Sequence, residues 1–141
     1  MRNCRTVEEI QAGDSAELSK RLSDGDVRRF AEAMSGPAQT PGEESGESVW
    51  SSNPQAACEI LCAGLIAAVL MSRLPGPGAR TLSQSLHFRQ PLLVGDTVTA
   101  RVTVTDKHEL SNWISLSTIC RNQKGDVVVD GEAVLMLSPR E

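Results

Sequence analysis

The side chains that could move a proton in this sequence are few and widely spaced. Glu43 and Glu44 lie in a run rich in Gly, Pro and Ser, whereas Glu59 lies in a long apolar segment. A carboxylate in either place could act as a general base that activates water. A simpler alternative exists for each: a solvated acidic loop for Glu43 and Glu44, and a favourable interaction with a helix dipole for Glu59.

The two histidines are the other candidates for acid–base chemistry. His87 lies between Leu86 and Phe88 in a segment of strand character. Its side chain is therefore expected on the face of the strand opposite to the one that these two apolar residues occupy. His108 lies in a predicted hairpin turn. We assign neither histidine a catalytic role.

The four cysteines show no spacing that indicates a metal or redox site. Cys4, Cys58, Cys62 and Cys120 form no CxxC pair, and no histidine stands near them at zinc-ligand spacing. Cys58 and Cys62 are four residues apart and would share one helix face. A nucleophilic cysteine needs a base or cation to lower its pKa, and none is evident. We interpret the thiols as reduced, and expect no metal and no cofactor.

The composition favours one folded domain. The 141 residues are 40% hydrophobic, with a net charge of −4 and a pI of about 5.2. No run of Lys and Arg is present, which argues against a nucleic acid or an anionic membrane as partner. The apolar run 60–71 is shorter than the roughly 18 residues of a membrane span. No apolar leader follows Met1, so we expect a cytoplasmic protein.

The first part of the chain predicts a strand, a helix and a long loop. The strand is expected over 15–22. Ser23 followed by Asp26 is typical of an N-terminal capping box and predicts a helix that ends near Gly36. Residues 37–54 are rich in Pro, Gly, Ser and Glu, which predicts a loop. A loop of this length in a compact domain is usually functional or mobile.

One long helix and four strands are predicted to follow. Asn53 and Pro54 are typical of a helix start, and the helix should end before Pro75. It is apolar nearly all round, with Glu59 its only charge before Arg73, so it should be buried on most sides. Partial alternation and β-branched residues predict strands over 80–90, 97–107, 112–122 and 126–137. Short turns imply an antiparallel sheet that wraps around the helix in an α+β architecture.

Three segments together resemble a known family. They are "FAEAMSG", "LPGPGARTLSQSLHFRQPLLVGDTVTARVTV" and "CRNQKGDVVVDGEAVL". In order and spacing they are similar to the MaoC-like enoyl-thioester hydratases, which have the hot-dog fold, and the similarity runs from about Val7 to Leu137. The resemblance implies a single hot-dog domain over residues 1–141 that forms a homodimer by pairing sheet edges. It also implies a ligand, an acyl thioester of CoA or of acyl carrier protein.

The resemblance also implies where the family's chemistry takes place. Its members add water reversibly across a 2,3-enoyl thioester, using an Asp just after Ser-Gly and a His five residues later. Ser35 and Gly36 match this pattern, but Pro37 stands at the position of the Asp. A one-residue shift would put Glu43 at the position of the His and Ala38 at that of the Asp. The water-activating pair is therefore absent under either alignment.

A second signature of the family is a His-Gly pair on the central helix. We align it with Ala63 and Gly64, so the His is lost and the Gly is kept. Gly64 then matches the glycine whose backbone N–H polarises the thioester carbonyl. The alternative for Gly64 is close packing of the helix on the sheet, at a cost of about 1 kcal/mol relative to Ala.

Three functions follow as hypotheses. The first is an acyl-thioester-binding protein related to the hydratases and dehydratases, in which hydration is lost or altered and Ser35, Gly36, Ala63 and Gly64 contact the ligand. The second is a hot-dog thioesterase that activates water with Glu43 or Glu59. The third is a non-catalytic dimerisation or docking module in an acyl-carrier system. Trp50 and Trp113 are expected to line either an acyl channel or a dimer seam.

Overall fold

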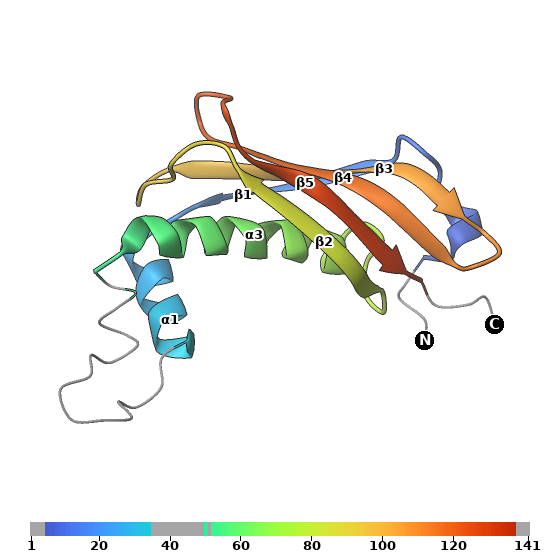
Figure 1. Cartoon of the computed structure of the whole chain (residues 1–141), viewed down its shortest axis with the longest axis horizontal. Helices are drawn as coiled ribbons and strands as arrows, with labels where there is room; N and C mark the ends of the chain where they lie inside the picture. The colour runs from blue at the N-terminus through green and yellow to red at the C-terminus, as the bar shows by residue number, and fades with distance from the viewer. Residues whose placement is uncertain (1–4, 35–49, 51, 138–141) are drawn as a thin grey trace.

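Within the described residues, the protein folds as one antiparallel sheet with two α-helices on the same side of it (Figure 1). The computed structural model describes residues 5–34, 50 and 52–137. A short 3-10 helix, η1 (Val7–Glu9), precedes the sheet. The strands are β1 (Ser15–Arg21), β2 (Arg80–Phe88), β3 (Thr97–His108), β4 (Trp113–Arg121) and β5 (Val127–Met136). The predicted α+β architecture, an antiparallel sheet around a long central helix, is confirmed.

Helix α1 (Asp24–Met34) begins at the predicted capping box. The backbone N–H of Asp26 donates to Ser23 Oγ at 3.2 Å, and the Ser23 N–H donates to Asp26 Oδ2 at 3.0 Å. These reciprocal bonds satisfy donors that a helix start otherwise leaves open. The described part of the helix ends two residues before the predicted Gly36.

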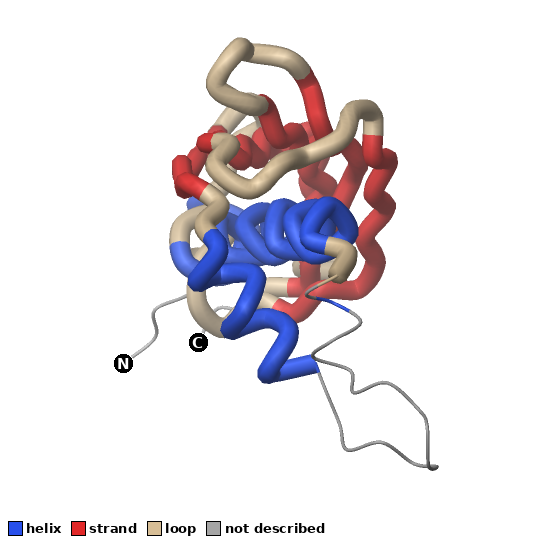
Figure 2. The backbone as a smooth tube through the Cα atoms, turned by 90° about the vertical axis from the view of Figure 1, so that its left-hand side faces the viewer, coloured by secondary structure: helices blue, strands red, loops and turns tan. Residues whose placement is uncertain are grey.

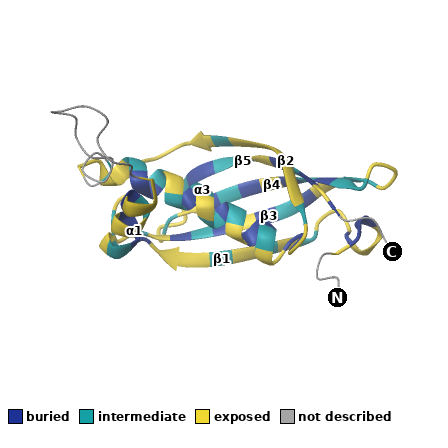
Figure 3. Cartoon of the chain, turned by 90° about the horizontal axis from the view of Figure 1, so that it is seen from below, coloured by how far each residue is buried: buried dark blue, intermediate teal, exposed yellow. Residues whose placement is uncertain are grey.

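Helix α3 (Pro54–Ser72) is the central helix and runs along one face of the sheet (Figures 1 and 2). It starts at the predicted Asn53–Pro54 pair and ends before Pro75, as expected. Six of its residues are buried against the sheet and α1: Ala57, Cys58, Cys62, Ile66, Val69 and Leu70. Burial is not all round, because Ile60 is 44% exposed, and α3 carries exposed residues on the side turned away from the sheet (Figure 3). The prediction of a helix buried on most sides therefore holds for only part of its circumference.

The sheet order is β1-β3-β4-β5-β2. Strands β3, β4 and β5 form the meander that their short turns predict. Strand β2 does not pair with β3, the next strand in the chain; it pairs with β5, from Arg80 opposite Met136 to Phe88 opposite Val129. Strand β1 pairs with β3. The edges of the sheet are therefore β1 and β2.

Gly131 explains how the backbones of β2 and β5 can approach closely where the two strands pair. A Cβ atom at this position would overlap the carbonyl oxygen of Ser85 and press on the backbone of Leu86. Only glycine therefore allows the backbone of β2 to come this close.

Helix α3 is also long enough and apolar enough to span a membrane, with a mean hydropathy of 1.8. The core helix of a sheet protein meets the same criteria of length and composition, and here Ile66 and Val69 of α3 are completely buried within the fold. Packing on the sheet explains the buried part of this apolar helix, which is 33% of the window that meets the criteria.

Candidate functional site

An open hollow lies at the N-terminal end of α3. It has a volume of about 500 Å³ and is lined by Asp24, Val27, Arg28, Pro54 and Val94. The first backbone N–H groups of a helix lack intrahelical acceptors, and the Asn53 side chain caps none of them. Because Pro54 has no N–H, Gln55 and Ala56 carry the N–H groups of this first turn that have no acceptor among the described residues. They could polarise a carbonyl placed in the hollow.

An apolar groove of about 230 Å³ runs along the side of α3 next to β1. It is lined by residues of α3 and by residues at the end of β1 and directly after it: Lys20, Leu22, Leu61, Gly64, Leu65 and Ala68. Nothing lies within 4 Å of the place where a Cβ of Gly64 would stand, so this glycine leaves the groove open. Such a surface suits a hydrocarbon chain.

Gly64 is exposed and lies in the interior of α3, ten residues after its first residue. Interior N–H groups of an α-helix donate to the carbonyl four residues earlier. The predicted role of the Gly64 N–H, polarising a thioester carbonyl, would require that bond to break. Gly64 lines the groove, and its role as a hydrogen-bond donor to a thioester carbonyl stays a prediction.

Glu59 is half-buried in the second turn of α3. No acidic residue lies in the first turn, which weakens the interpretation of Glu59 as a dipole partner. Glu59 and Ala63 are one turn apart on the same side of the helix. Gly64 is five residues from Glu59, about 140° around the axis, and the groove that it lines does not include Glu59. The structure therefore does not bring Glu59 and Gly64 together.

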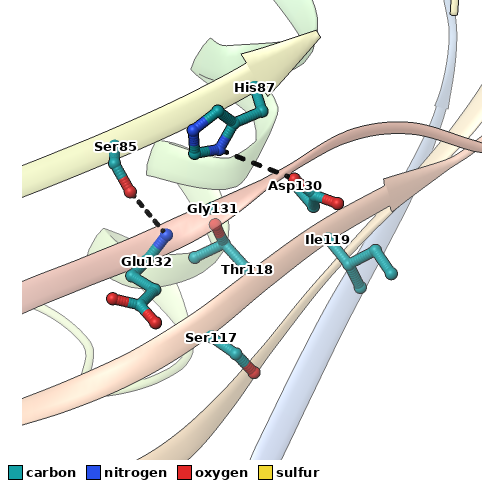
Figure 4. Close-up of a pocket in the computed structure, with 8 residues that line it drawn as sticks. All are labelled: Ser85, His87, Ser117, Thr118, Ile119, Asp130, Gly131 and Glu132. Atoms are coloured by element: carbon teal, nitrogen blue, oxygen red, sulfur yellow. Dashed lines mark hydrogen bonds and ion pairs between the residues drawn. The ribbon is translucent and has the colours of Figure 1, made fainter. Parts of the chain in front are cut away.

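His87 lies in a third hollow, of about 510 Å³, on the face of the sheet opposite α3 (Figure 4). Its Nδ1 is 3.7 Å from Asp130 Oδ1, and Arg89 Nε donates to both oxygens of Asp130 at 3.1 Å. Leu86, the preceding residue, packs against the core. The predicted orientation of His87, away from the helix, is confirmed. His87 therefore lies outside both the hollow at the start of α3 and the apolar groove.

The two tryptophans each contact another ring, in different parts of the fold. His108 stacks on Trp113 with ring centroids 3.5 Å apart, at the turn between β3 and β4. The Trp50 ring contacts Phe30 of α1 edge-on, with centroids 4.7 Å apart. Neither tryptophan lines the hollow at the start of α3 or the groove, so neither of their predicted roles finds support there.

Asp26 is a buried carboxylate next in sequence to Val27, which lines the hollow. Its hydrogen bonds and ion pairs, however, are all made within the fold. It accepts hydrogen bonds from the Ser23 N–H and hydroxyl and forms ion pairs with Lys20 and Arg29. The backbone hydrogen bond from Ser23 is the largest cause that lowers the pKa of Asp26 far below its usual range, against the opposing effect of burial. A carboxylate held this firmly in its charged form is a poor proton acceptor near neutral pH.

Several predicted site residues lie outside the described part of the chain. They are Ser35, Gly36 and Glu43, together with most of the predicted loop 37–54. Pro54 itself belongs to α3. Within the described residues, no group of three or more His, Cys, Asp or Glu side chains could hold a metal ion.

The sequence did not reveal the contribution of β1. Lys20 and Leu22 complete the groove, and Arg28 of α1 lines the hollow. Leu22 was predicted only as the end of a strand. The signal that could have found these residues is the capping box at Ser23, since it fixes the place where the chain turns from β1 toward the start of α3.

Comparisons with known proteins agree with the fold. Residues 11–131 match the family described as FAS1-like, dehydratase domain region. The (R)-specific enoyl-CoA hydratase of Rhodospirillum rubrum is 40% identical over 135 residues, which cover 94% of this chain and 92% of that protein. The 3-hydroxybutyryl-CoA dehydratase of Methylorubrum extorquens is 34% identical over 134 residues, covering 95% and 85%. The unliganded R-hydratase PhaJ1 from Pseudomonas aeruginosa has a TM-score of 0.78 at 28% identity, covering 97% and 88%.

Proposed function

The chain belongs to the FAS1-like dehydratase family, with the hot-dog fold of the MaoC-like hydratases, and on this premise we propose that it binds acyl thioesters of CoA or of acyl carrier protein without the family's usual hydration chemistry. The apolar groove along α3 is the observation that carries the binding part of this proposal. Among the described residues, the lining of this groove includes no His, Asp or Glu, and this observation carries the chemical part.

The Asp and His pair that activates water in the resembling hydratases is missing from the part of the sequence where it is needed. The chain has two histidines; His87 lies on the opposite face of the sheet and His108 at the turn after β3. Between Asp26 and Asp96 the sequence contains no Asp. Hydration needs a group that takes a proton from water within hydrogen-bond reach. The loss of hydration rests on these facts.

The proposed ligand would occupy the hollow at the start of α3 and the apolar groove beside it. The thioester carbonyl would accept hydrogen bonds from the free N–H groups of Gln55 and Ala56, and the distal carbons of the acyl chain would lie against Leu61, Leu65 and Ala68. Each buried CH₂ contributes about 0.8 kcal/mol. Each extension by two carbons should therefore tighten binding about tenfold until the groove is full.

Calorimetric titration with butyryl-, octanoyl- and dodecanoyl-CoA tests the binding. The wild type should bind more tightly as the chain lengthens. Gly64→Leu should remove most of this dependence because the new side chain fills the groove, whereas Gly64→Ala should keep it. Equal affinity for all three chains in the wild type would contradict the assignment of the groove.

Crotonyl-CoA tests the chemistry. We expect its enoyl absorbance to persist over many minutes in the presence of micromolar protein. Rapid loss of that absorbance, with formation of the 3-hydroxy product, would show that the water-activating function has been retained by residues that we have not assigned.

Glu59 favours a second candidate function, because it is a half-buried carboxylate on an apolar helix. In a thioesterase it would activate water for attack on the thioester carbonyl. Thiol release from acyl-CoA would reveal this activity, and Glu59→Gln should abolish it while leaving binding intact. If no CoA-bound or carrier-bound thioester binds at all, a non-catalytic dimerisation or docking module becomes the better interpretation.

A further inference from the structure

Two cysteines from distant parts of the chain meet inside the core. Cys62 lies in the middle of α3, and Cys120 lies on β4, 58 residues later. Their sulfur atoms are 2.6 Å apart, and both side chains are completely buried. A disulfide bond measures about 2.05 Å, so a small displacement of either side chain would bring the sulfurs to bonding distance.

The surroundings exclude other common roles of paired thiols. Within the described residues, Cys62 and Cys120 belong to no group of three or more metal-binding side chains. The hydrogen bond to Cys120, followed by burial, raises the pKa of Cys62. A thiol held in its neutral form is a poor nucleophile, so the folded pair is not suited to covalent catalysis.

Cys58 provides an internal comparison. It is equally buried on α3, one turn before Cys62. Burial, followed by the negative charges of Asp96, Asp26 and Asp24, raises its pKa. Among the described cysteines, it has no sulfur contact like that between Cys62 and Cys120.

We propose that Cys62 and Cys120 are a disulfide-forming pair that ties α3 to β4 when the chain folds in the presence of a low-molecular-weight disulfide such as oxidised glutathione. In the unfolded chain, the thiolate of one cysteine attacks glutathione disulfide, which gives a mixed disulfide and releases one glutathione. Folding brings the second cysteine onto that bond. Its sulfur displaces the second glutathione and gives up its proton, so two protein thiols are oxidised and one glutathione disulfide is reduced to two thiols.

Burial has two consequences for this bond. The fold selects one pair among the six combinations of four cysteines, because only Cys62 and Cys120 are held in contact within the described residues. A reducing thiol must reach a sulfur atom to break the bond, and both of these sulfurs lie inside the core. The bond should therefore resist reduction until the protein unfolds.

The experiment is oxidative refolding followed by peptide mapping. Denatured, reduced protein is refolded in a glutathione redox buffer, quenched with acid, alkylated and digested. We expect a mass 2 Da below that of the reduced protein and one cross-linked peptide pair containing Cys62 and Cys120. Recovery of folded protein with four free thiols, or a cross-link that uses Cys4 or Cys58, would overturn the proposal.

Variants and stability supply matched controls. Cys58→Ser should keep the 2 Da loss, whereas Cys62→Ser and Cys120→Ser should each abolish it. The wild-type peptide map decides the outcome by itself if either of the last two variants fails to fold. The cross-link closes a loop of about 58 residues, so the oxidised protein should melt roughly 10 °C above the reduced protein. Dithiothreitol should reverse this shift only in the presence of denaturant; reversal in the folded protein would contradict the buried location.

Discussion

Asp26 shows how a single carboxylate can resemble a catalytic residue and serve the fold instead. It lies close in sequence to the hollow at the start of α3, and it is only 8% exposed. Its contacts to Ser23, Lys20 and Arg29 all favour its charged form. Removing the charge should therefore affect stability and not ligand chemistry.

We predict that Asp26→Asn lowers the free energy of unfolding by about 2 kcal/mol at pH 7, because the capping bonds and both ion pairs lose a charge. The pKa of Asp26 is lower in the folded state than in the unfolded state, so its stabilisation is complete above the unfolded value near 4. The difference between wild type and variant should shrink as the pH falls below about 4. Urea unfolding at pH 7, 4 and 3 measures it.

Asp24→Asn is the control for this prediction. Asp24 is exposed in the first turn of the same helix, and an acid in that position contributes only about 0.5 kcal/mol through the helix dipole. A difference between wild type and Asp26→Asn that stays constant from pH 7 to pH 3 would show that the charge of Asp26 is not the cause.

At the scale of elements, two glycines that look alike in the sequence have opposite surroundings. A Cβ at Gly131 would overlap the Ser85 carbonyl, whereas a Cβ at Gly64 would meet nothing within 4 Å. We predict that Gly131→Ala destabilises the protein by about 3 kcal/mol through overpacking. Gly64→Ala should stabilise it by up to about 1 kcal/mol, because alanine is the better helix former. Chemical denaturation of both variants tests the pair, and equal effects would contradict the packing of β2 on β5.

The sequence predicted the bounds of the helices and strands better than it predicted which strands pair in the sheet. Capping at Ser23, Asn53 with Pro54, and the alternation of the four later strands placed the starts of both helices and the bounds of these strands within about two residues of those observed, whereas η1 was not predicted. The pairing of β2 was not predicted, because nothing in residues 80–90 shows that this strand pairs with β5 at the edge of the sheet. Gly131 permits this pairing, because any side chain there would overlap the Ser85 carbonyl, but the sequence alone does not show which strand approaches it.

The candidate site was less predictable for the same reason. Gly64 was identified by resemblance, yet its role depends on Lys20 and Leu22, which lie more than 40 residues earlier and reach the groove through the pairing of β1 with β3. The contact between Cys62 and Cys120 is likewise invisible in the spacing of the cysteines. Contacts between distant segments decide both features, and local patterns cannot report them.

At the scale of the whole molecule, the two edges of the sheet differ in chemistry. Strand β1 carries Glu17, Lys20 and Arg21, and Glu17 pairs with Arg101 at 3.3 Å. Charges of this kind protect an edge strand from pairing with another chain. Strand β2 carries one charge, Arg80 at its first residue, and exposes Leu82 and Phe88, each 43% accessible. Such an edge is suited to pairing with another copy of itself.

We therefore predict a homodimer that forms through β2. Leu82→Lys should shift the protein toward the monomer, because a lysine on an edge strand is solvated in the monomer and must be desolvated in the dimer. Leu110→Lys is the matched control, since Leu110 is fully exposed in the turn between β3 and β4. Light scattering after size-exclusion chromatography, over a tenfold range of protein concentration, measures the mass. A wild type that stays monomeric throughout, or a Leu82→Lys variant that stays dimeric, would show that β2 is not the interface.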